Sequence, residues 1–175
     1  DSTATSPWGH GRQAKWLLSL QVWLNVLQNG VNVSCLALAA KPYGRGVYQT
    51  AQTVSLIIDP LAAALGFRVL PGPVALIVAT LAVTGSQGYI LALSLDSVEP
   101  PMLEGGGAAL IVLVTAVGRA LTAYAKMSAN VLLQVGEGAE SRLMMAGVAM
   151  QGGSFLGTVA MYVLINYTEL FRGAN

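Results

Sequence analysis

Residues 16–40 read WLLSLQVWLNVLQNGVNVSCLALAA, and this stretch decides the fold. It contains no charged side chain, and it is longer than the roughly 20 mostly apolar residues that cross the hydrocarbon core of a bilayer as a helix. Four comparable runs follow, so we expect membrane-spanning helices near residues 16–40, 46–69, 73–95, 107–133 and 143–166. The sequence therefore predicts an all-α, polytopic membrane bundle of five transmembrane helices.

The composition fits a chain that lies largely in hydrocarbon. Hydrophobic residues make up 54% of the chain and charged residues only 10%, whereas roughly a quarter of the residues of a soluble domain are charged. The net charge is +1 and the lysines and arginines are scattered, so nothing points to nucleic acid as a partner. The composition excludes a soluble domain and makes the lipid bilayer the expected surroundings.

The five spans and their loops account for nearly the whole chain. We expect residues 1–15 to form a linker or disordered tail, residues 16–166 a five-helix transmembrane half-domain, and residues 167–175 a C-terminal tail. Five spans make an odd number and a small bundle, and the chain begins with Asp-Ser-Thr rather than methionine. We therefore interpret the chain as the C-terminal part of a longer protein with an N-terminal partner bundle.

Each span carries a polar stripe at helical spacing. The stripes are Gln21, Asn25, Gln28 and Asn32; Tyr48, Gln52, Ser55 and Asp59; Thr80, Thr84 and Gln87; Thr115, Arg119, Thr122 and Lys126; and Gln151, Ser154, Thr158 and Tyr162. Because amides and charges are costly in contact with lipid, we expect these faces to turn toward one another or toward water. Five helices that share a polar interior indicate a pathway or a binding cavity.

Two of the spans contain residues that disturb a helix at mid-depth. Asn29-Gly30 favours a kink or local unwinding of the first span. Asp59-Pro60 predicts a break in the second, because proline removes a ladder hydrogen bond and disfavours helical dihedrals in the residue before it. Discontinuous helices of this kind occur in secondary transporters.

Three charged residues, Asp59, Arg119 and Lys126, lie within the spans away from their ends, and each needs an explanation. A charged side chain at the bilayer centre costs about 2.5–3.5 kcal/mol on insertion scales. We therefore expect Asp59 to be paired with Arg119 or Lys126, or to be protonated; an unpaired, protonated Asp59 could couple transport to protons. The alternative is an aspartate at a helix end, exposed at the membrane interface.

Enzymatic motifs are absent from the sequence. It contains no His-Glu-x-x-His, no Gly-x-Ser-x-Gly and no phosphate-binding glycine loop. The single histidine, His10, lies in the polar tail, and the single cysteine, Cys35, has no metal-ligand set around it. We expect neither an enzyme nor a metal or cofactor site.

Several short motifs occur in an order that resembles a known family. They are Asn29-Gly30-Val31, Lys41-Pro42-Tyr43-Gly44, Val47-Tyr48, Asp59-Pro60-Leu61-Ala62, Gly88-Tyr89, Ala123-Tyr124-Ala125-Lys126, and Gly147-Val148-Ala149-Met150-Gln151 followed by Gly153-Ser154-Phe155-Leu156-Gly157. This run, from about residue 16 to 166, resembles the C-terminal half of the solute-carrier riboflavin transporters, spans seven to eleven of eleven. The chain departs from that pattern at Asp59, where the family usually has a neutral asparagine, and at Lys41, which replaces a leucine.

The resemblance implies a function and partners. It implies a multi-pass protein of the plasma membrane that transports riboflavin by alternating access and that needs an N-terminal six-helix half. Two other interpretations stay open. One is a carrier of another flat polar metabolite, such as a nucleoside, because a fold does not determine a substrate. The other is a structural or receptor-like membrane subunit whose polar stripes only hold helices together.

Riboflavin is flat and neutral, with a hydroxylated tail, so its site needs amides and an aromatic ring to stack on. The amide candidates for substrate binding are Gln28, Asn29, Asn32, Gln52 and Gln151, and the aromatic candidates are Tyr48 and Tyr124. For each amide the alternative is a hydrogen bond between helices, which contributes about 0.6 kcal/mol on average.

Overall fold

The computed structural model describes residues 10–69, 71–95, 106–168 and 170–171, and these residues are mostly helical. The elements are α1 (His10–Asn25), η1 (Val26–Asn32), α2 (Val33–Ala40), η2 (Lys41–Tyr43), α3 (Arg45–Arg68), α4 (Pro73–Leu95), α5 (Gly107–Leu133) and α6 (Ala139–Tyr167). The first four form one rod, so the described residues contain five helices long and apolar enough to cross a membrane. This confirms the all-α bundle of five spans.

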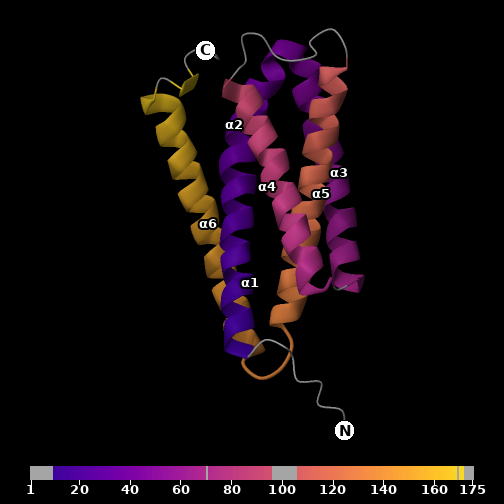
Figure 1. Cartoon of the computed structure of the whole chain (residues 1–175), viewed down its shortest axis with the longest axis vertical. Helices are drawn as coiled ribbons and strands as arrows, with labels where there is room; N and C mark the ends of the chain where they lie inside the picture. The colour runs from indigo at the N-terminus through magenta and orange to yellow at the C-terminus, as the bar shows by residue number, and fades with distance from the viewer. Residues whose placement is uncertain (1–9, 70, 96–105, 169, 172–175) are drawn as a thin grey trace.

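The rods run alternately up and down (Figure 1). Helix α3 packs along α5, α6 packs along α1 and η1, and α4 contacts α5 and α2. The first rod begins at His10, so residues 10–15, which we had expected in the tail, are already helical. Residues 96–105, between α4 and α5, lie outside the described residues.

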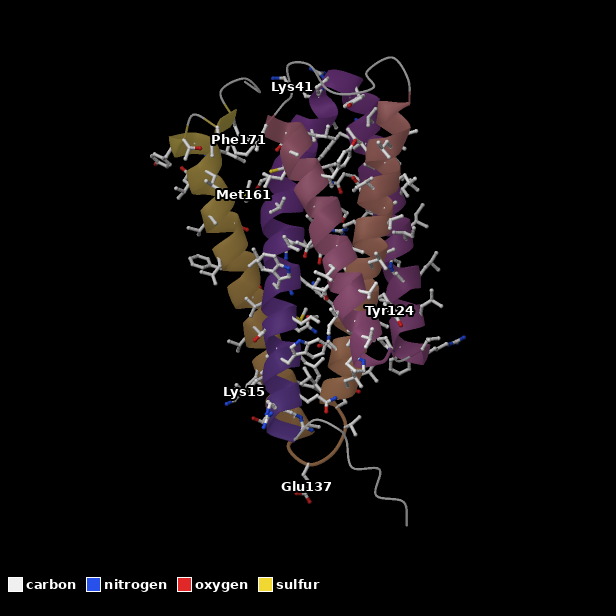
Figure 2. All side chains as sticks on the ribbon, in the orientation of Figure 1. Lys15, Lys41, Tyr124, Glu137, Met161 and Phe171 are labelled. Atoms are coloured by element: carbon white, nitrogen blue, oxygen red, sulfur yellow. The ribbon has the colours of Figure 1, made fainter. Side chains whose placement is uncertain are left out.

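The interior contains two apolar clusters. One, near the Lys15 end, is built around Leu24 and Leu133, and the other, near the Lys41 end, includes Cys35 and Phe171 (Figure 2). Large apolar side chains also cover the outside of the bundle, as lipid-facing surfaces require. Examples are Leu56 and Leu61 on α3, Val74 and Leu81 on α4, and Phe155 on α6.

Of the two expected helix disturbances, the structure contains the one at Asn29-Gly30 and lacks the one at Asp59-Pro60. Around Asn29-Gly30 the α-helix gives way to the π-helical segment η1, which confirms a local departure from α geometry. The expected break at Asp59-Pro60 is wrong, because α3 is continuous from Arg45 to Arg68 with Pro60 inside it. Proline removes only one hydrogen bond of the helix, and α3 packs extensively along α5.

Glycines bring α6 unusually close to the first rod. A Cβ built on Gly157 would lie 2.6 Å from the carbonyl oxygen of Val26, and one on Gly30 would lie 2.7 Å from the backbone of Gly157. Gly153 faces the backbone of Val22 in the same way. Gly153 and Gly157 therefore form a packing face of the small-xxx-small kind, with two small residues four positions apart.

The close contact between α6 and the first rod at Gly30, Gly153 and Gly157 is called the seam below. Gly157→Ala should destabilise it, because the added methyl group has no room unless the two backbones separate. We expect a loss of about 1–3 kcal/mol, typical of overpacking, seen as a lower Tm of the purified chain in detergent. Gly147→Ala on the same helix is the matched control, since a Cβ there meets nothing within 4 Å. Equal Tm values for the two variants would contradict a tight seam at Gly157.

Candidate functional site

The charged residues of the spans meet between α3 and α5. Arg119 donates a hydrogen bond from Nη2 to Oδ2 of Asp59, and the two side chains are 17% and 23% exposed. Asp59 lies well inside α3, so the alternative of an aspartate at a helix end is wrong. The expected ion pair is confirmed, with Arg119 as the partner, and the pair carries no net charge.

Lys126 lies about two turns beyond Arg119 along α5 and has neutral partners. Its ammonium donates hydrogen bonds to Oδ1 of Asn25 at 2.8 Å and to Oε1 of Gln28 at 2.9 Å. Asp59 forms its salt bridge with Arg119, and Lys126 has no carboxylate partner among the residues that the structure describes. The three charged side chains together therefore carry one positive charge that this part of the chain does not balance.

Lys126 and Asp59 share the wall of a pocket, which we call the Lys126 pocket. Its volume is about 350 Å³, within the range of about 300–1,000 Å³ usual for small-molecule sites. It is lined by Gln28, Asp59, Pro60, Ala63, Ala123, Lys126, Met127 and Asn130. In the described part of the chain no group of three His, Cys, Asp or Glu side chains gathers, so no metal-ligand cluster is seen there.

Two of the predicted binding amides connect helices instead of lining this pocket. Asn32 is buried and donates to Oε1 of Gln87 on α4 at 3.3 Å. Asn29 donates to the hydroxyl of Ser154 on α6 at 2.7 Å. These contacts are interhelical hydrogen bonds, the alternative role stated above for each amide.

The other candidates are spread over the bundle. Gln52 donates to the hydroxyl of Tyr48 at 3.3 Å, and Tyr48 lines a second pocket, of about 420 Å³, close to Lys41. Tyr124 donates to the backbone carbonyl of Val69 at 3.1 Å, near the opposite end of the bundle (Figure 2). Gln151 is exposed on α6. Of the seven predicted substrate residues, only Gln28 lines the Lys126 pocket.

Two asparagines outside the predicted set, Asn25 and Asn130, belong to the site. Asn25 accepts from Lys126, and its own amide donates to the carbonyl of Gln21 at 2.7 Å. Asn130 lines the pocket and accepts from Nε2 of Gln21 at 2.9 Å. Asn130 follows Lys126 by one helical turn, so extending the stripe of α5 by one step would have found it.

A bundle of five apolar spans with an ion pair and an unbalanced lysine beside a pocket defines a polytopic membrane protein with a polar, charged groove. The sequence model of "Solute carrier family 52, riboflavin transporter" matches residues 3–173. The chain belongs to this family.

Individual relatives agree with the family match. The chain is 36% identical to human solute carrier family 52, riboflavin transporter, member 2, over 89% of the chain and 35% of that protein. It is 32% identical to riboflavin transporter rft-2 of Caenorhabditis elegans, over 94% of the chain and 35% of that protein. The chain thus spans about a third of the length of the curated relatives that it matches. No solved structure gives a significant match.

The ion pair predicts strong coupling between Asp59 and Arg119. Asp59→Asn or Arg119→Gln alone leaves one charge without its partner, and we expect each to lower stability by about 1.5–3 kcal/mol. The double variant leaves no isolated charge and should be closer to wild type than the sum of the two losses. A double-mutant cycle of unfolding in detergent measures this coupling, and strictly additive losses would contradict it.

Proposed function

We propose that this chain is the C-terminal half of a plasma-membrane carrier that transports riboflavin by alternating access. The observation that carries the proposal is the family match over residues 3–173, together with relatives that are named riboflavin transporters. The Lys126 pocket supports it, since a helical subunit with a purely structural role has no need of an unbalanced cation beside a pocket.

In this proposal the site is completed by an N-terminal six-helix half. The Lys126 pocket lies at the surface of the bundle and is walled only by α3, α5 and the first rod. Secondary transporters place their substrate near mid-membrane between two structural repeats. A second half packed over the pocket would close it around the substrate, and rocking of the two halves would expose the site to either side in turn.

The residues of the first rod and α5 are the strongest candidates for substrate contact. Gln28 and Lys126 line the pocket and offer hydrogen-bond donors to a ring edge. Tyr48 is an exposed ring on α3 that could stack on a flat substrate beneath the N-terminal half. Asn29 and Asn32 hold their helices together, so we assign them a supporting role.

Expression in cells that lack their own flavin carrier tests the proposal. We expect labelled riboflavin uptake when the chain is co-expressed with its N-terminal half, and none from the chain alone, because the site lies between the halves. Competition by unlabelled nucleosides and purines distinguishes riboflavin from other flat polar substrates. Robust uptake by the chain alone would contradict the two-half arrangement, and absence of flavin uptake by the pair would contradict the function.

The ion pair also leads to a prediction about protons. The idea that Asp59 couples transport to protons required an unpaired carboxyl, whereas Asp59 is paired with Arg119. Asp59→Asn should therefore change the rate of uptake but not the shape of its pH profile. Uptake by the complete carrier across a pH series, each curve normalised to its own maximum, checks this, with Glu140→Gln at the exposed start of α6 as the control. A pH profile flattened only by Asp59→Asn would restore the coupling role.

A further inference from the structure

We propose that the Lys126 pocket binds the acceptor edge of the flavin ring, N1 and the C2 carbonyl, and favours flavins that carry a negative charge there. The inference rests on the proposed function and deepens it, because riboflavin itself is neutral. It assigns the contact to Lys126 and Gln28, whose side chains line the pocket.

The first step is the charge balance of the pocket. Asp59 lies on the wall, but its charge is balanced by Arg119. Asp59 and Lys126 line the same pocket and Arg119 is paired with Asp59, so the three groups together present one excess positive charge to a ligand. In a low-dielectric setting such a charge attracts a negative group strongly.

The second step is the arrangement of donors. An ammonium group has three N–H donors, and Lys126 uses two of them on the amide oxygens of Asn25 and Gln28. The third donor is available to a ligand in the pocket. Because the oxygen of Gln28 faces Lys126, the NH₂ group of the same amide adds further donors beside it. The wall therefore presents adjacent donors to the ligand.

The third step is the chemistry of a matching ligand. Adjacent donors with a positive charge fit two adjacent acceptors that share a negative charge. In the flavin ring N1 and the C2 carbonyl oxygen form such a pair, and this pair takes up negative charge when the ring is an anion of the kind used below. A positive group near N1 is one of the ways in which proteins tune flavins. Asn25 and Gln28 hold Lys126 in place before the ligand arrives, which limits the entropy lost on binding.

Three flavins that differ in charge test the inference in the complete carrier. The probes are riboflavin, 8-demethyl-8-hydroxyriboflavin, which is an anion near neutral pH with its charge spread to N1 and the C2 carbonyl, and the neutral 8-methoxy analogue, which controls for size at position 8. The measurement is the concentration of each compound that halves labelled riboflavin uptake. We expect the anion to compete about tenfold better than the two neutral compounds, as a charge-assisted hydrogen bond implies.

Variants link this preference to the lysine. Lys126→Gln should bring the anion-to-neutral ratio close to one, whereas Lys126→Arg should retain the preference. Lys15→Gln removes one positive charge from an exposed position at the end of the bundle and should leave the ratio unchanged (Figure 2). The comparison uses the ratio of the inhibitory concentrations of the anionic and neutral flavins, not the rate of uptake. A variant with fewer carriers in the membrane therefore still gives a valid ratio.

Failure of this inference can be distinguished from failure of the proposed function. Equal competition by anionic and neutral flavins in the wild type would overturn the inference and leave riboflavin transport standing; the counter-charge of Lys126 would then be a carboxylate elsewhere in the carrier. The wild type and Lys126→Arg are sufficient to test the inference, so the test remains valid even if Lys126→Gln does not fold. Absence of riboflavin uptake by the complete wild-type carrier would overturn the proposed function and this inference together.

Discussion

Hydrocarbon offers no hydrogen-bond partner, so a polar group within a membrane span must find its partner in the protein or in a water-filled cavity. The first rod shows how this requirement organises the bundle. Gln21 and Asn25 are buried and exchange hydrogen bonds with α5 or with their own helix, and Asn32 reaches α4. Trp23 donates its indole N–H to Thr84 on α4 at 3.0 Å. The same side chains that would be costly in lipid therefore define which helices are neighbours.

Close packing of helix backbones, in addition to hydrogen bonds, holds the bundle together. Without a hydrophobic driving force between helices in lipid, association depends on van der Waals contact and on polar contacts. Gly30 and Gly157 let the π-helical segment and α6 meet backbone to backbone, and the bond between Asn29 and Ser154 lies at the same seam. The π geometry thus occurs at a close backbone contact with α6, which makes it part of the packing of the bundle.

Lys126 is the charged residue of the interior whose charge no described neighbour balances. Asp59 and Arg119 satisfy each other's charge, and interior amides such as Gln21 and Asn32 bond to neighbouring helices. Lys126 has only neutral partners among the described residues, and it lies on the wall of a pocket. A charge left in this state is the feature that a binding role explains and a packing role does not.

Much of this arrangement follows from the amino-acid sequence alone. The length of the apolar runs determined five spans, because the bilayer thickness sets the length of a spanning helix, and the order of the motifs indicated the family. The spacing of Gly153 and Gly157 marked a packing face, since residues four apart lie on one side of a helix. The sequence also narrowed the partner of Asp59 to two residues, Arg119 and Lys126.

Only the tertiary structure decided between those two residues, because the choice depends on how α3 and α5 are aligned against each other, and no local pattern encodes that alignment. It likewise separated Gln28, which lines the pocket, from Asn29 and Asn32, which bond to other helices. A polar residue on a helix has the same spacing whether it faces a ligand or a neighbour. The continuity of α3 through Pro60 was also beyond the sequence, because packing along α5 outweighs the local cost of proline.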